Sequence, residues 1–191
     1  VDLNTGGGNV LMRGSSVGSD NGAGVRVFNS TIDAGSGGVT LYGVGAGLAS
    51  GVSLDGSNFT VGAPGIHIDG HSATMDGVHA TGSDLTVTGG DIDLTGIGAI
   101  HGVYFDGGLY STGGNIRVHG EGGSANGTTI TGVVDSAGGG IDIYGSSTGA
   151  MGLVLGGGDY AGVTSGGGNI VLHGDGATGG VALYRGHFSG D

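Results

Sequence analysis

A short strand-like motif recurs seven times along the chain, and this repetition constrains the fold more than any other feature. The last copy reads Gly-Gly-Asn-Ile-Val-Leu-His-Gly, from Gly167 to Gly174, and every copy ends in a glycine. From one closing glycine to the next, the spacings are 29, 27, 26, 24, 25 and 29 residues. A period in this range is typical of a solenoid built from repeated coils. The closing glycines are Gly14, Gly43, Gly70, Gly96, Gly120, Gly145 and Gly174.

Glycine is so frequent that it limits which secondary structures can form. Of 191 residues, 53 are glycine, and the longest stretch without one is the ten residues from Val25 to Ala34. A helix of three turns therefore has no uninterrupted segment in which to form. A single proline and the lack of a three-residue period exclude collagen, and a hydrophobic content of 36% is too high for a disordered chain. Apolar and polar residues alternate within the repeats, which predicts β-strands.

Each repeat contains three such segments, and aligning the seven repeats places apolar residues in columns. Because side chains two residues apart share one face of a strand, these columns form the inner surface of a three-sided coil. In the second segment the inward columns begin at Val25 and Val27. In the first segment the leading inward column is Val10, Val39, Ile66, Ile92, Ile116, Ile141 and Ile170. In the third, shorter segment the inward residues are expected to be Ile32, Phe59, Leu85, Tyr110, Val134, Tyr160 and Phe188.

One coil cannot cover its own apolar positions, but stacked coils bury them together. We therefore predict an all-β fold, a parallel β-helix (β-solenoid) of about seven three-sided coils of 24 to 29 residues, with no capping helix. The closing glycines are expected at corners, where positive φ or close approach between coils favours a residue without a Cβ atom. Residues 1–191 are expected to be a single β-solenoid segment of a longer repeat array. Open strand edges at its ends would favour self-assembly, end to end or laterally, so neighbouring coils of the same or adjacent chains are expected partners.

Charge and composition exclude several classes of partner. Sixteen acidic residues, four arginines and no lysine give a net charge of −12, which repels nucleic acid and anionic membranes. No apolar run approaches the roughly 20 residues of a membrane-spanning helix. The chain has no cysteine, so disulfides and thiolate metal sites do not arise. An acidic surface rich in hydroxyl groups is compatible with an extracellular location.

Outward-facing residues of the first segment provide the candidate binding site. Asp93, Arg117 and Asp142 occupy one outward column on three successive repeats, which predicts a ladder of alternating charges that stabilises the stack. The alternative is a surface stripe that contacts glycans, formed by His67, Arg117 and His119. The sequence does not separate these two interpretations.

No catalytic, cofactor-binding or metal-binding residues are predicted. Asp55 and Asp106 share a column but lie two coils apart, near 9.6 Å at a strand spacing of about 4.8 Å, and so do not converge. The calcium-binding nonapeptide of some β-helices is not matched, because Ile170 and Val171 stand where its aspartate ligand belongs. Glycine-rich strings such as Gly156 to Gly158 lack the lysine and helix of a phosphate-binding loop.

The repeat resembles those of a known family. The pattern of Gly-Gly-Gly-Asn-Ile-Val-Leu-His-Gly, ending at Gly174, together with the segment from Gly51 to Val61, is similar to the repeats of filamentous haemagglutinin-like adhesins. These are large exoproteins of two-partner secretion or autotransporter systems in Gram-negative bacteria. The resemblance covers nearly the whole chain and implies a right-handed β-helical shaft on the cell surface or outside the cell. The acidic balance and the absence of an amino-terminal secretion domain from these residues depart from the family.

The leading hypothesis is a non-enzymatic shaft or stalk segment of a surface adhesin or extracellular filament, with glycans or other surface proteins as partners. The alternative is a carbohydrate-active or carbohydrate-binding β-helix, similar to a polysaccharide lyase or hydrolase. Such enzymes carry long loops around a cleft, whereas the longest link between first and second segments here has nine residues, between Gly14 and Gly24. A third hypothesis, ice binding, requires a regular threonine ladder, and the mixed outward columns disfavour it.

Overall fold

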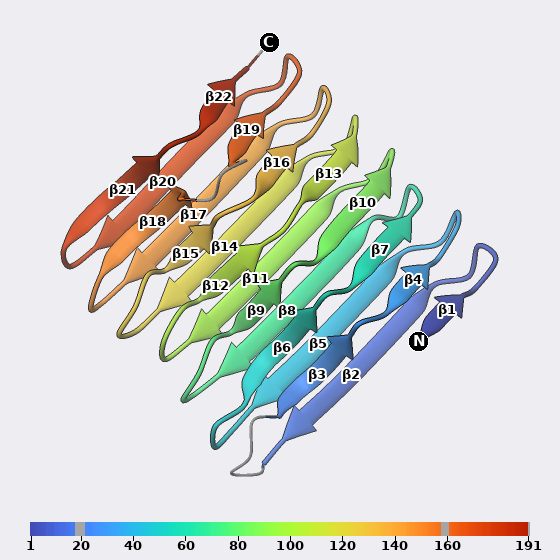
Figure 1. The fold of residues 1–191 in the computed structure, drawn as a ribbon, viewed down its shortest axis with the longest axis horizontal. Helices are drawn as coiled ribbons and strands as arrows, with labels where there is room; N and C mark the ends of the chain where they lie inside the picture. Colours follow the sequence, from blue (N-terminus) through green and yellow to red (C-terminus); the bar gives the residue numbers. More distant parts are fainter. Residues whose placement is uncertain (18–21, 158–160, 191) are drawn as a thin grey trace.

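The computed structural model describes residues 1–17, 22–157 and 161–190, and the regular elements of these residues are all β-strands. The strands form three parallel sheets, and successive coils stack in sequence order from the blue end of the molecule to the red end (Figure 1). The predicted all-β, three-sided solenoid of about seven turns is therefore confirmed. In the described part of the chain no helix, capping or otherwise, is present.

Each coil contributes one strand to each sheet. Sheet B contains the longest strands, each seven residues long: β2 (Val10–Ser16), β5 (Val39–Gly45), β8 (Ile66–Ser72), β11 (Ile92–Gly98), β14 (Ile116–Gly122), β17 (Ile141–Ser147) and β20 (Ile170–Gly176). Sheet C contains β3 (Ala23–Phe28), β6 (Ser50–Asp55), β9 (Val78–Thr81), β12 (Val103–Asp106), β15 (Thr128–Ile130), β18 (Met151–Gly156) and β21 (Gly179–Tyr184). Sheet A contains β1 (Asp2–Asn4), β4 (Thr31–Asp33), β7 (Asn58–Val61), β10 (Asp84–Thr88), β13 (Leu109–Thr112), β16 (Val133–Asp135), β19 (Gly162–Thr164) and β22 (His187–Ser189).

The strand register confirms the inward columns of sheets B and C. Val10 pairs with Val39, which pairs with Ile66, and the column continues in register to Ile170. In sheet C the column that begins at Val27 continues through successive strands in the same way. Alternation along each strand thus places one set of side chains inside, and parallel pairing repeats this set on every coil.

The core is a continuous apolar column along the axis of the coil stack. Leu94, Phe105 and Ile116 have at most 1% of their surface exposed. On the outermost strand of sheet C, β21, the inward residues Val181 and Leu183 are 42% and 50% exposed. Burial of an inward side chain therefore depends on a coil on each side of it, as expected for a structure in which each repeat contacts its neighbours.

One of the expected residues of the third column, Tyr110, is wrong. Leu85 pairs with Leu109, which is buried, and Tyr110 lies on the outward side and is half-buried. The reason is a shorter corner: three residues lie between Thr81 and Leu85, but only two lie between Asp106, the partner of Thr81, and Leu109. A shift of one residue turns a strand's side chains to the other face.

The last coils of the third column include Val134, Val163 and Phe188. Tyr160 lies outside the described residues, and the inward position of its coil belongs to Val163, which pairs with Val134 and is 3% exposed. Phe188 pairs with Val163 and is correctly placed in the column. Val134 is also confirmed as an inward residue.

The role expected of the closing glycines is also corrected. Gly96 lies inside β11 rather than at a corner, and its φ is not positive. A Cβ atom on Gly96 would lie 2.1 Å from the carbonyl oxygen of Gly102, just before β12 of the same coil. The close approach is therefore between sheets B and C within one coil. Positive φ occurs instead in turns that follow sheet A strands, as at Gly89 and Gly113, and sheet C strands, as at Gly82 and Gly107.

Candidate functional site

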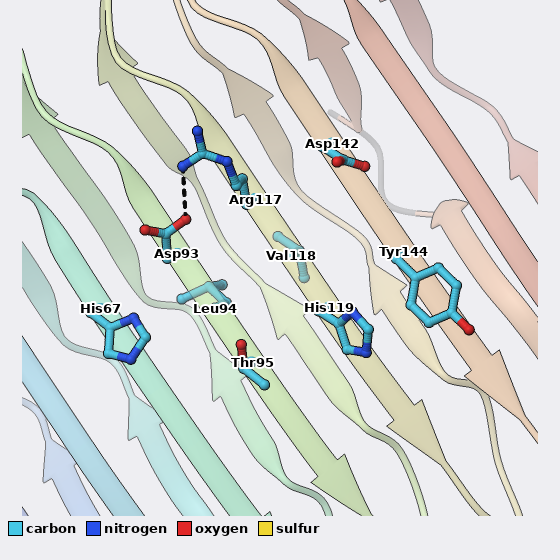
Figure 2. Close-up of a pocket in the computed structure, with 9 residues that line it drawn as sticks. All are labelled: His67, Asp93, Leu94, Thr95, Arg117, Val118, His119, Asp142 and Tyr144. Atoms are coloured by element: carbon cyan, nitrogen blue, oxygen red, sulfur yellow. Dashed lines mark hydrogen bonds and ion pairs between the residues drawn. The ribbon is translucent and has the colours of Figure 1, made fainter.

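The outward face of sheet B carries the three residues predicted to form a glycan-contact stripe. His67 on β8 and Arg117 on β14 share one outward column, with Asp93 of β11 between them, and His119 lies two residues beyond Arg117. His67, Arg117 and His119 all line one shallow groove with a volume of about 320 Å³ (Figure 2). The structure therefore brings the predicted residues together on one surface. The groove is lined by His67, Asp93, Leu94, Thr95, Arg117, Val118, His119, Asp142 and Tyr144.

Arg117 is held by two carboxylates of the preceding coil. Its Nη1 atom donates to Asp91 Oδ2 at 2.7 Å and to Asp93 Oδ1 at 3.1 Å. Figure 2 shows the second of these bonds crossing from one strand to the next. Burial opposes ionisation of Asp91, but the hydrogen bonds from Arg117 and Asn115 outweigh it and lower the pKa of this carboxyl. Hydrogen bonds to both aspartates raise the pKa of Arg117 further above its ordinary value.

The predicted ladder of alternating charges is confirmed in its strand register, but its ion pairs differ from the expected ones. Asp93, Arg117 and Asp142 do lie in adjacent positions of one column. Both ion pairs of Arg117, however, are with the preceding coil, through Asp91 and Asp93. Asp91 directly precedes β11 and was not predicted as a partner. Its position two residues before Asp93, on the same side of the chain, was the available signal.

A column of rings runs beside the charged column and was not predicted as a unit. Tyr144 lies between His119 and His173, with ring centroids 4.5 Å and 5.2 Å apart and nearly parallel planes. Toward the first coils, the Tyr42 ring contacts His67 edge-on at 5.6 Å. Except for His67, which lies in the charged column, these rings occupy the position directly before the closing glycine of their repeats, so the sequence alignment contained the signal for Tyr144.

The acids of sheet C do not converge into a catalytic pair. Asp55 pairs in register with Thr81, which pairs with Asp106. Thr81 Oγ1 donates to Asp55 Oδ1 at 3.2 Å, and Thr131 Oγ1 donates to Asp106 Oδ1 at 3.0 Å. Arg26 Nε also donates to Asp55 Oδ2, at 3.3 Å. Each carboxylate is therefore bound by neighbouring side chains that fix it in a surface ladder.

The side chains that line the groove on sheet B indicate which kind of ligand suits it. The charge of Arg117 is compensated by two carboxylates, and Asp142 lines the same groove, so the groove does not favour an anionic ligand. Its rings, hydroxyl groups and carboxylates suit a neutral molecule with several hydroxyl groups. In the described residues no group of three or more His, Cys, Asp or Glu is arranged to hold a metal ion. Nor do those residues include a helix of the length and hydrophobicity that a membrane span requires.

Comparisons with protein-family models, with curated proteins and with solved structures found no match for this chain.

Proposed function

We propose that this chain is a non-enzymatic shaft segment of a surface adhesin or extracellular filament, located on or outside a Gram-negative bacterial cell. The observation that carries the proposal is the uninterrupted register of sheet B, whose seven-residue strands pair at every position from β2 to β20. No insertion interrupts this sheet to wall off a cleft. The resemblance of the repeats to filamentous haemagglutinin-like adhesins agrees with this role.

A parallel β-solenoid suits a shaft because its length and stiffness come from the same contacts. Every coil is joined to the next by backbone hydrogen bonds in three sheets and by the apolar core. Each added coil extends the shaft by about 4.8 Å. The outward side chains vary without disturbing the core, so they are free to contact glycans, surface proteins or neighbouring shafts, including copies of the same chain.

Location provides the direct test of this proposal. An antibody raised against residues 1–191 should label intact cells of the source organism. In immunogold electron micrographs, the gold particles should lie away from the cell envelope. A second antibody against a cytoplasmic protein of the same cells controls for leakage. Labelling that appears only after the cells are made permeable would contradict the proposal.

The groove on sheet B favours a second candidate function, carbohydrate binding. We expect immobilised neutral polysaccharides to bind the chain, and acidic ones to bind more weakly, because carboxylates surround Arg117. The variant Tyr144→Ala should bind about tenfold more weakly, since it removes the tyrosine ring that lines the groove on β17 and stacks on His119. Tyr110→Ala, on sheet A, is the matched control and should bind as the wild type does.

Two outcomes of this binding experiment separate the alternatives. Equal loss of binding in both tyrosine variants, or no binding to any neutral polysaccharide, would contradict the candidate function. New reducing ends or unsaturated products after incubation would instead indicate a polysaccharide hydrolase or lyase. Both readouts use the same purified chain.

A further inference from the structure

A nearly buried carboxylate joins two histidines from successive coils at the corner between sheets B and C. Asp76 lies in the link before β9, and its side chain is 9% exposed. His79 Nδ1, on β9 of the same coil, lies 2.7 Å from Asp76 Oδ2. His101, in the corresponding link of the next coil, contacts Asp76 Oδ1 through Nδ1 at 3.0 Å and donates its backbone N–H to it at 2.9 Å. One side chain thus connects both coils.

The rings of this cluster are packed rather than free. Tyr104 on β12 stacks on His79 with a centroid distance of 5.2 Å and an interplanar angle of 15°. The same tyrosine packs against His101 at 5.4 Å. His79 and His101 are 35% and 23% exposed, so solvent screens their interaction with Asp76 incompletely. Two histidines from two coils therefore hold one carboxylate, and Tyr104 packs on both of their rings.

The other ionisable groups around the cluster favour a positive charge on His79. Asp55 of β6 adds an attractive charge on the side of the preceding coil. Arg26 of β3 is bound to that same Asp55 at 3.3 Å, which leaves a smaller negative charge facing the imidazole. Asp55, Arg26, Asp76 and His79 together line a cavity of about 220 Å³. Within this cavity Asp76 is the carboxylate that binds His79 directly.

We propose that Asp76, His79 and His101 form a pH-dependent clamp: protonated His79 fixes the charged carboxylate of Asp76 within its own coil, and that carboxylate accepts the hydrogen bonds from His101 of the next coil, so the clamp is strongest under mildly acidic conditions. The protonated imidazole of His79 donates from Nδ1 to a charged carboxylate. Such charge-assisted hydrogen bonds are stronger than neutral ones. After deprotonation the contact is between a neutral ring and the same carboxylate, and the clamp is weaker.

The direction of the pH dependence follows from both partners. The hydrogen bond to Asp76 raises the pKa of His79 above 6.5 against the opposing effect of burial, and the charges of Asp76 and Asp55 add to it. Its contribution to stability is complete below pH 6.5 and is lost as pH rises through the higher pKa of the folded state. Burial opposes ionisation of Asp76, but hydrogen bonds from His101 and His79 hold the pKa of this carboxyl well below 3.8. Its contribution is complete above pH 3.8 and is lost only in stronger acid.

The exposed histidines of sheet B provide internal controls. His119 lies 3.1 Å from Glu121, and His173 lies 3.0 Å from Asp175, but each of these side chains is about half exposed or more. Exposed pairs of this kind contribute little to stability because water and salt screen them. The buried carboxylate at Asp76 is what distinguishes the clamp from these surface pairs.

The first test is an NMR titration of the histidine rings in the isotopically labelled chain. In the wild type, the ring of His79 should titrate above 6.5, and in Asp76→Asn its midpoint should fall below the wild-type value. The ring signals of His119, on sheet B, are the control, and at any one pH they should be at the same positions in both proteins. A wild-type midpoint for His79 at or below 6.5, or a midpoint that does not change in Asp76→Asn, would overturn the proposal. The wild-type measurement decides even if the variant fails to fold.

The second test is urea denaturation at several pH values. Between about pH 5.5 and about pH 8 the midpoint urea concentration of the wild type should fall, and this fall should be smaller in His79→Gln. The control variant His119→Gln should keep the wild-type pH dependence. An unchanged pH dependence in His79→Gln would show that the cluster is only a packing contact, and the proposal would be wrong.

Discussion

Replacing Phe105 with alanine should lower the free energy of unfolding by about 3 to 5 kcal/mol. The ring has 0% of its surface exposed, in the inward column of sheet C. Its register neighbours are Ala80 on the preceding coil and Ile130 on the following one. Ala80 is too small to fill the space that the ring leaves, so a cavity persists between the coils. Urea denaturation, monitored by circular dichroism, measures this loss of stability.

The matched control for this prediction is Phe28→Ala. Phe28 lies on the outward side of β3, is 56% exposed and contacts the guanidinium group of Arg26 at 5.0 Å. Removing it should cost about 1 kcal/mol or less, since only an exposed contact is lost. Equal destabilisation by the two variants would contradict the assignment of Phe105 to the solenoid core.

Replacing Gly96 with alanine should destabilise the fold by about 3 kcal/mol, although only one methyl group is added. Its Cβ atom would lie 2.1 Å from the carbonyl oxygen of Gly102 and 2.8 Å from Cγ2 of Val103. The nearest atom belongs to the backbone, so relief of the clash requires β11 and the start of β12 to separate. Thermal and urea denaturation of the variant measure this cost.

Gly140→Ala provides the control for the clash at Gly96. Gly140 directly precedes β17, has no positive φ, and would place a Cβ atom 3.3 Å from a side-chain atom, Asn115 Oδ1. A shift of a few tenths of an ångström in the Asn115 side chain relieves this contact and keeps its hydrogen bond from the Gly140 N–H, so the change in stability should stay within about 1 kcal/mol. A loss at Gly140 as large as that at Gly96 would indicate a general need for glycine flexibility rather than a specific close approach.

Most of the fold could be predicted from the sequence because alternation and repetition are both local signals. Val10, Val39 and Ile66 occupy equivalent positions of successive repeats, and parallel pairing preserves this equivalence in space. The errors arose at corners, where no alternation exists. Corner length decides whether Leu109 or Tyr110 faces inward, and the alignment of apolar residues did not fix that length.

The sheet B groove was partly predictable for the same reason. His67, Arg117 and His119 lie on strands, so their outward orientation followed from the pattern of their neighbours. The cluster around Asp76 was missed because Asp76 and His101 belong to links rather than to strand columns. Their separation of 25 residues, about one repeat, was the signal that would have placed them side by side.

The stacking of each coil on the previous one has a consequence for how such a chain acquires its structure. Partners in neighbouring strands of sheet B are 24 to 29 residues apart everywhere in the chain, because the register never skips a coil. Folding rates fall as the sequence separation of contacts grows, and here that separation does not increase with chain length. A much longer array could therefore form progressively, each newly delivered winding settling on a completed template at a pace independent of how many windings precede it.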